Sequence, residues 1–150
     1  MKRFHKRLLA VLLGFGVIVA LFARPCLDWL LISSASRGNA LAVNVLLSIG
    51  ADPNTKDVDA GNALVQAAYH GHSAVIHQLL AAGGDPNAHI SGGETALMYA
   101  ARYGHTNTVK ILLIAGADPN RDDGNGYTPL KYAKEHPDIV YLLRQSGAKH

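Results

Sequence analysis

The strongest constraint on the fold is a five-residue turn motif that recurs every 33 residues. Residues 50–54 read GADPN, residues 83–87 read GGDPN and residues 116–120 read GADPN. A truncated copy, Gly-Ala-Lys, starts at Gly147, and a Leu-Leu pair precedes all four copies. Proline cannot continue a helix, and Asp and Asn favour turns, so each copy ends one structural unit. A period of this length predicts an elongated stack in which each unit packs against its neighbours.

Between these turns, apolar residues follow the period of a helix. Leu64, Ala67 and Ala68 lie on one face of an expected first helix, and the alanines allow a neighbouring helix to approach closely. Ile76 and Leu79 belong to the apolar stripe of a second helix, and both patterns recur 33 residues later. The glycine that opens each turn motif suits the left-handed conformation that ends a helix. We therefore expect two helices with facing apolar sides in each unit and an all-α fold.

The first helices carry a recognisable motif. Residues 95–100 read TALMYA and residues 128–133 read TPLKYA. Both resemble the Thr-Pro-Leu-His-x-Ala signature of the ankyrin repeat family, although no copy has the histidine. The resemblance covers roughly residues 25–148 and implies a solenoid of helix-turn-helix repeats with a β-turn finger projecting between repeats. We expect one ankyrin domain over residues 25–149, with four repeats at about 25–54, 55–87, 88–120 and 121–149.

Several units depart from the repeat pattern. The first is expected to have helices at about 27–36 and 40–49 and to lack a finger. The second has Asn62 at the helix cap, where asparagine serves as well as threonine, and Ala60 in place of a finger glycine, which predicts a distorted turn. The fourth loses three residues between its helices, where residues 134–138 replace the usual Gly-His. We expect this unit to be a C-terminal cap with a polar outer face.

The positive charge is concentrated at one end of the chain. The formal net charge is +3, but residues 1–24 contain five basic residues and no acidic one. The remaining 9 basic and 11 acidic residues give −2, which argues against binding to a nucleic-acid backbone. The single cysteine, Cys26, cannot form a disulfide within the chain.

The N-terminal segment has the features of an export signal. Four basic residues precede an uncharged apolar run at residues 8–23, which predicts an N-terminal hydrophobic helix. We expect residues 1–24 to be an uncleaved signal anchor. The alternative is a cleaved signal peptide, which the large Leu21 and the nearby Pro25 disfavour.

The charge asymmetry around the run predicts its orientation. The positive-inside rule places the N-terminus in the cytoplasm and the domain outside it. Together with the resemblance, this indicates a small exported bacterial protein in the inner membrane, with its domain periplasmic or otherwise extracytoplasmic. Signal cleavage would instead yield a soluble periplasmic or secreted protein, and an inverted anchor would leave the domain in the cytosol.

The polar residues do not predict a catalytic, cofactor or metal site. His72 and His105 occupy the family's Gly-His positions, where a hydrogen-bonding role at the helix start is the expectation. His70 and His72 form a spaced pair without Cys or acidic company, which is a weak metal signal. The recurring aspartates belong to the turn motif. No serine or cysteine has a spaced His and acid that the repeat leaves unexplained, so we expect a non-enzyme.

The positions that vary between repeats are the candidates for binding a protein partner. They fall on the fingers, just before the helix caps and at the ends of the first helices, on the concave face that a curved stack offers. They are Lys56, Asp59, Tyr69, His70, His89, Glu94, Arg102, Tyr103 and Tyr127. Tyrosine and arginine concentrate binding energy at interfaces. We therefore predict a hot spot of Tyr69, Arg102, Tyr103 and Tyr127, with no nucleic acid and no small-molecule substrate.

Three roles fit such a module. It could support or escort another exported protein, or it could be an immunity protein that neutralises a toxin. It could also be a structural scaffold that assembles at the membrane, joined covalently through Cys26. An enzyme would need a convergent polar cleft that the repeat does not explain.

Overall fold

The structure is a computed structural model that describes residues 26–57 and 61–149. The expected signal anchor or signal peptide at residues 1–24, the turn at Ala60 and the candidate Asp59 lie outside the described residues. Within the two described stretches, no helix is both long enough and apolar enough to span a membrane.

Within the described residues, four pairs of helices follow one another. Residues 26–36 are helical and pair with α2, which agrees with the expected first repeat. The second repeat also contains a two-stranded antiparallel hairpin in its finger, in which Lys56 pairs with Asn62 and Asp57 with Gly61. The labelled elements are α2 (Ala40–Ser48), β1 (Lys56–Asp57), β2 (Gly61–Asn62), α3 (Ala63–Tyr69), α4 (Ser73–Ala81), α5 (Ala96–Arg102), α6 (Thr106–Ile114), α7 (Pro129–Tyr132) and α8 (Pro137–Gln145).

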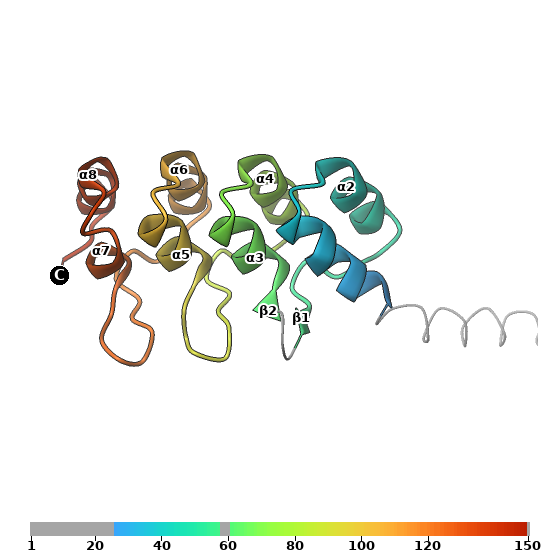
Figure 1. The fold of residues 1–150 in the computed structure, drawn as a ribbon, viewed down its shortest axis with the longest axis horizontal. Coiled ribbons are helices and arrows are strands. Elements are labelled where there is room, and N and C mark those ends of the chain that lie inside the picture. The colour runs from blue at the N-terminus through green and yellow to red at the C-terminus, as the bar shows by residue number, and fades with distance from the viewer. Residues whose placement is uncertain (1–25, 58–60, 150) are drawn as a thin grey trace, which may run out of the picture.

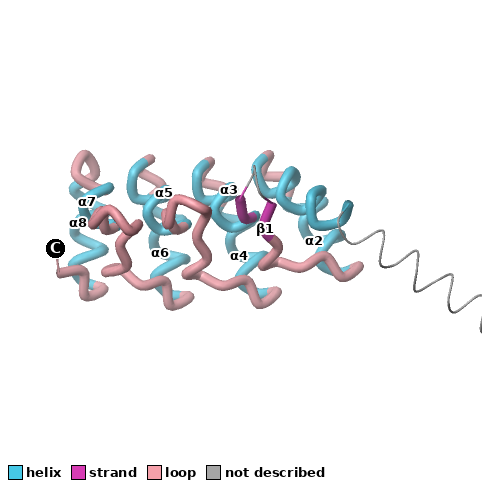
Figure 2. Tube along the Cα trace, turned by 90° about the horizontal axis from the view of Figure 1, so that it is seen from below, coloured by secondary structure: helices cyan, strands magenta, loops and turns pink. Residues whose placement is uncertain are grey.

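The pairs stack in a single row. The first helices form one side of the row and the second helices form the other, and the fingers project from the first-helix side (Figure 1). Seen from that side, the fingers cross the row at regular intervals (Figure 2). Helix α5 contacts α3 and α7, and α4 contacts α2 and α6, so each helix packs on its equivalents in adjacent repeats. The expected ankyrin solenoid is confirmed.

The core is built from the residues that the helical pattern indicates. Leu64, Ala67 and Ala68 of α3 are almost completely buried, as are Ile76 and Leu79 of α4. Their equivalents in α5 and α6 are buried in the same way. Because the first helices meet through alanines, α3 and α5 can lie close together. Asn62 caps α3 as expected, since its side-chain oxygen accepts hydrogen bonds from the N–H groups of Leu64 and Val65.

The asparagine of the turn motif joins each repeat to the next. Asn87 Nδ2 donates to the carbonyl of Gly116 at 3.2 Å, and Asn87 Oδ1 accepts from the N–H of Asp118 at 2.7 Å. Asn54 and Asn120 make the equivalent pairs of bonds. These bonds satisfy the carbonyl of the glycine that follows the next second helix and the N–H of the second residue after it.

Histidines make a second series of links between repeats. The Nε2–H of His105 donates to the carbonyl of Tyr69 at 3.1 Å, and His72 bonds to Ser36 in the same way. The ring of His105 lies against Gly71, where an added Cβ would come within 2.6 Å of it and where φ is +74°. Thus the histidines do bond at the helix starts as expected, but they bond to the preceding repeat rather than capping their own helices.

The shortened fourth repeat keeps this link. The Nε2–H of His136 donates to the carbonyl of Arg102 at 3.2 Å, and its ring lies against Gly104. Residues 134–138 thus replace the Gly-His element as expected, and within them His136 makes the link that His72 and His105 make in the earlier repeats. The expected polar outer face is confirmed, since Asp138, Arg144 and Gln145 of α8 are exposed.

The asparagine links can be tested by a matched pair of substitutions. We expect Asn87→Ala to lower the free energy of unfolding by about 2 kcal/mol, because it removes two hydrogen bonds between repeats. Asn107→Ala makes the same chemical change at an exposed position of α6 and should shift stability by less than about 0.5 kcal/mol. Urea unfolding followed by circular dichroism measures both. Equal stability of the two variants would contradict a linking role for Asn87.

Candidate functional site

The structure places most of the predicted binding residues on the first-helix side of the row. Tyr69, Tyr103 and Tyr127 are 41%, 42% and 50% exposed. His70, Arg102 and Lys56 are exposed, and His89 and Glu94 are half-buried.

The tyrosines of neighbouring repeats touch. The ring centroids of Tyr69 and Tyr103 are 4.7 Å apart in an edge-to-face arrangement, and Tyr69 also meets Tyr99 at 5.7 Å. A hydrogen bond with Tyr69, followed by burial, raises the pKa of the Tyr103 hydroxyl. His70 packs edge-on against Tyr69 at 4.8 Å. The contacts follow from the close approach of α3 and α5, which brings the ends of these helices together.

Arg102 extends this aromatic surface toward the fourth repeat. Its guanidinium carbon lies 5.7 Å from the ring centroid of Tyr103 and 5.9 Å from that of Tyr132. Both distances are in the range of cation–π attraction. Within residues 26–57 and 61–149, no hydrogen bond or ion pair engages the guanidinium, so its planar set of N–H donors is available to another molecule.

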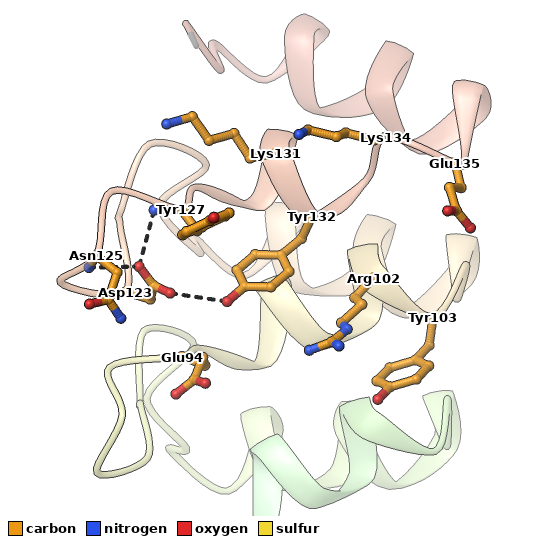
Figure 3. A pocket seen from close by; sticks show the side chains of 10 residues that line it. All are labelled: Glu94, Arg102, Tyr103, Asp123, Asn125, Tyr127, Lys131, Tyr132, Lys134 and Glu135. Atoms are coloured by element: carbon orange, nitrogen blue, oxygen red, sulfur yellow. Dashed lines mark hydrogen bonds between the residues drawn. The ribbon is translucent and has the colours of Figure 1, made fainter.

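Asp123 organises the finger beside Tyr132. Its carboxylate accepts from the N–H groups of Asn125 at 2.9 Å and Tyr127 at 3.0 Å, and from the Tyr132 hydroxyl at 3.0 Å (Figure 3). Burial acts to raise the pKa of Asp123, but these hydrogen bonds outweigh it and leave the pKa below its ordinary value. Burial, together with the hydrogen bond to Asp123 and its charge, raises the pKa of Tyr132 to about 12.

These residues line an open groove between the third and fourth repeats. Its volume is about 620 Å³ (Figure 3). Lys131 and Lys134 lie along the α7 side, and Glu94 lies on the finger of the preceding repeat. The lining residues are Glu94, Arg102, Tyr103, Asp123, Asn125, Tyr127, Lys131, Tyr132, Lys134 and Glu135.

The groove brings together four of the nine predicted residues. Glu94, Arg102, Tyr103 and Tyr127 all line it, and Tyr69 adjoins it through Tyr103. The other predicted residues within the described chain are not among its lining residues: Lys56, His70 and His89.

Two important groove residues did not emerge from the sequence. Tyr132 occupies the x position of the signature motif, where the second repeat has Gln66 and the third has Tyr99. The difference between Gln66 and the two tyrosines is a signal that could have identified it. Asp123 lies in a finger, where no repeated pattern marks it, and only the folded loop reveals its three hydrogen bonds.

One carboxylate oxygen on the edge of the groove lacks a hydrogen-bond donor. Glu94 Oε2 is buried and has no hydrogen-bond partner among the described residues. The negative charge of Glu94 adds to burial in raising the pKa of Tyr99.

The histidines of this region are engaged in packing. The rings of His70 and His72 stack with centroids 5.7 Å apart, and His72 Nε2 is bonded to Ser36. Over the described stretches, no group of three or more His, Cys, Asp or Glu residues is arranged to hold a metal ion.

The raised pKa of Tyr132 predicts a pH dependence of stability. The folded chain keeps this proton to about pH 12, whereas an ordinary tyrosine loses it near 10.0. The stability that the hydroxyl contributes is therefore complete below pH 10.0 and is lost as the pH rises toward about 12. We expect Tyr132→Phe to cost about 1 kcal/mol at neutral pH and to reduce this alkaline loss. Urea unfolding across this pH range measures both effects.

Tyr141→Phe is the matched control, because it removes an exposed tyrosine hydroxyl from α8, outside the groove. It should retain the wild-type alkaline loss. The assignment to Tyr132 is contradicted if the two variants behave alike.

The chain was compared with protein families and with curated proteins. A family model described as ankyrin repeats (3 copies) matches residues 30–123 and again residues 64–150. The search of curated proteins finds no match. Ankyrin repeats are generally protein–protein interaction modules, and the family is typically non-catalytic. The two matches span the turn motifs, the fingers and the groove described above, and the chain belongs to the ankyrin repeat family.

Proposed function

We propose that this chain is a membrane-tethered, non-catalytic module that binds a protein partner on the concave face of its repeats. The binding surface is the aromatic row, which consists of Tyr69, Tyr103, Arg102, Tyr132 and Tyr127. Its tethering segment is residues 1–24, and its domain lies outside the cytoplasm. The partner is recognised by protein surface chemistry, without a cofactor or a metal.

The main support for the proposal is the environment of the Arg102 guanidinium. Its guanidinium is held near the rings of Tyr103 and Tyr132 and has no hydrogen-bond or ion-pair partner in the described part of the chain. Binding residues that are already positioned lose little conformational entropy when a partner arrives. An arginine held in this way is suited to a carboxylate or to backbone carbonyls of a partner, because its donors form a planar fork.

The shape and charge of the groove favour a protein over other ligands. The groove is lined by three basic and three acidic side chains, so it lacks the excess of positive charge that a nucleic-acid backbone requires. Exposed tyrosines with arginine are the residue types that dominate protein interfaces. We therefore place the partner across the third and fourth repeats, with Tyr69 at the margin.

The tether follows from the sequence before the domain. Residues 8–23 are uncharged and apolar, and the basic residues are concentrated before them. By the positive-inside rule, this arrangement places the domain on the extracytoplasmic side, which is the periplasm in a Gram-negative bacterium. Cleavage after the apolar run would give the same binding module in soluble form.

A double substitution tests the binding surface. We expect Tyr69→Ala with Tyr103→Ala to weaken partner capture by about 30-fold, since interface hot spots contribute about 2 kcal/mol or more. The full chain is used as bait in its native membrane fraction after mild solubilisation, and captured proteins are identified and quantified by mass spectrometry. Both tyrosines are exposed, so circular dichroism should show the same fold and a similar melting temperature.

Tyr141→Ala is the control, because it removes an exposed tyrosine from α8, outside the aromatic row. It should capture the partner as well as the wild type does. The proposal fails if the double variant is folded and retains the partner at the wild-type level. The identity of the partner distinguishes an accessory role from immunity, and recovery of a second copy of the chain supports a scaffold.

A fusion tests the topology separately from binding. Alkaline phosphatase joined after residue 150 is active only outside the cytoplasm, so we expect activity in intact cells. Reversing the charge of the basic residues before the apolar run should reduce this activity. An abundant but inactive fusion would instead support a cytosolic domain.

A further inference from the structure

The two ends of the stack differ in character. At the C-terminal end, α8 exposes charged and polar side chains. At the other end, the first repeat exposes five large apolar side chains, which we call the end patch. The end patch consists of Trp29 (55% exposed), Leu30 (42%), Leu41 (78%), Val45 (49%) and Ile49 (58%).

Comparison with the next two repeats shows that the end patch is specific to the first repeat. The position of Leu41 is Ala74 in the second repeat and Asn107 in the third, and both are exposed. The position of Ile49 is an exposed alanine in both repeats. Large apolar residues therefore replace small or polar ones on the solvent side of α2.

A second part of the end patch lies where a preceding repeat would pack. Leu30 corresponds to Ala63 and Ala96, which are completely buried in the stack. Val45 corresponds to Gln78 and Ile111, which are half-buried. In the first repeat the equivalent positions are exposed. Trp29 lies on the first-helix side, where it lines a groove with Ser36, Arg37 and Gln66. The end patch therefore extends from one side of α2, over the uncovered end of the stack, to the first-helix side.

The sequence immediately before the end patch indicates what covers it. The apolar run ends at Ala23, and only Arg24 and Pro25 separate it from the helix of residues 26–36. The three Cα–Cα steps from Ala23 to Cys26 span at most about 10 Å, so the environment of the run must lie next to the first repeat. Arg24 in the sequence and the exposed Arg37 supply positive charge at either end of that helix.

We infer that the end patch rests on the surface of the lipid bilayer that holds residues 8–23. This inference depends on the tether proposed above. Trp29 suits such a position because tryptophan concentrates at the boundary between lipid and water. Leucine, valine and isoleucine bury their side chains among the upper acyl chains, and arginines bind the headgroups.

The contact of the end patch with the bilayer orients the rest of the molecule. Leu41 and Val45 of α2 and Ile49, the C-cap residue of that helix, follow one another at four-residue intervals and so lie on one side of the second-helix row. Helices α5 and α7, which carry Arg102 and Tyr132, belong to the third and fourth repeats, at the opposite end of the stack (Figure 1). A stack that stands on its first repeat therefore holds the groove away from the membrane, toward a partner.

The only tryptophan in the chain, Trp29, reports on this contact directly. The full chain is reconstituted into vesicles of phosphatidylcholine and phosphatidylglycerol, and flotation shows whether it is bound. Tryptophan fluorescence is then measured with lipids brominated at the upper acyl chain and with aqueous acrylamide. We expect bromolipid to quench Trp29 and acrylamide to be largely excluded from it.

Two variants make the test specific. Leu41→Asn, Val45→Gln and Ile49→Ala together install residues that this fold already carries at the equivalent positions of other repeats. This triple variant should still float with the vesicles but lose most bromolipid quenching and gain acrylamide quenching. Trp29→Phe with Tyr141→Trp moves the reporter to the polar end, where acrylamide should quench it and bromolipid should not.

The outcomes distinguish the contact of the end patch with the bilayer from the tether at residues 1–24. If the chain floats but bromolipid does not quench Trp29, the proposed contact of the end patch with the bilayer is wrong and the tether stands. Quenching that the triple variant retains also overturns that contact, because proximity would then come from the tether alone. If acrylamide reaches Trp29 once the protein is diluted in excess lipid, the end patch contacts a second copy of the chain instead of the bilayer. If the chain does not float, both the tether and the contact of the end patch with the bilayer are contradicted.

Discussion

The rest of the structure depends on the contact between successive first helices through alanines. Ala67 and Ala68 of α3 and Ala100 and Ala101 of α5 are completely buried, so the two helices approach without large side chains between them. This close approach allows residues one repeat apart to touch at the helix ends. The contacts of Tyr69 with Tyr103 and of Arg102 with Tyr132 both join adjacent repeats. A single larger residue between these helices would therefore disturb the binding surface as well as the stack.

The same regular spacing serves both stability and binding. Asparagines of the turn motif and histidines at the second helices link each repeat to its neighbour through backbone groups, which all repeats possess whatever their side chains. The side chains at the helix ends and fingers are thereby left to vary. In this chain they collect a positioned arginine and four tyrosines on one side, and large apolar residues at one end.

The sequence predicted the fold well because its signals repeat. The turn motif, the alanine faces and the Asn62 cap all reappear in the structure as expected. The prediction of the site was less complete. Tyr132 was missed although its position differs between the second repeat and the later ones, and the link made by His136 was not predicted, because three residues are missing between the helices of the fourth repeat. A shorter connection changes the path of the chain, and whether a side chain still reaches its acceptor depends on that path in space.

By itself, the sequence determined the repeat length, the helices, the turns and the family of the protein. These depend on local chemistry: proline and glycine at turns, helical spacing of apolar residues, and small residues at contacts. Only the tertiary structure decided which variable residues share one surface. Glu94, Arg102, Asp123 and Tyr132 come from separate segments, and the groove exists because the stacking distance brings those segments together. Tertiary packing also left the end patch exposed, since burial there depends on a neighbour rather than on the residues themselves.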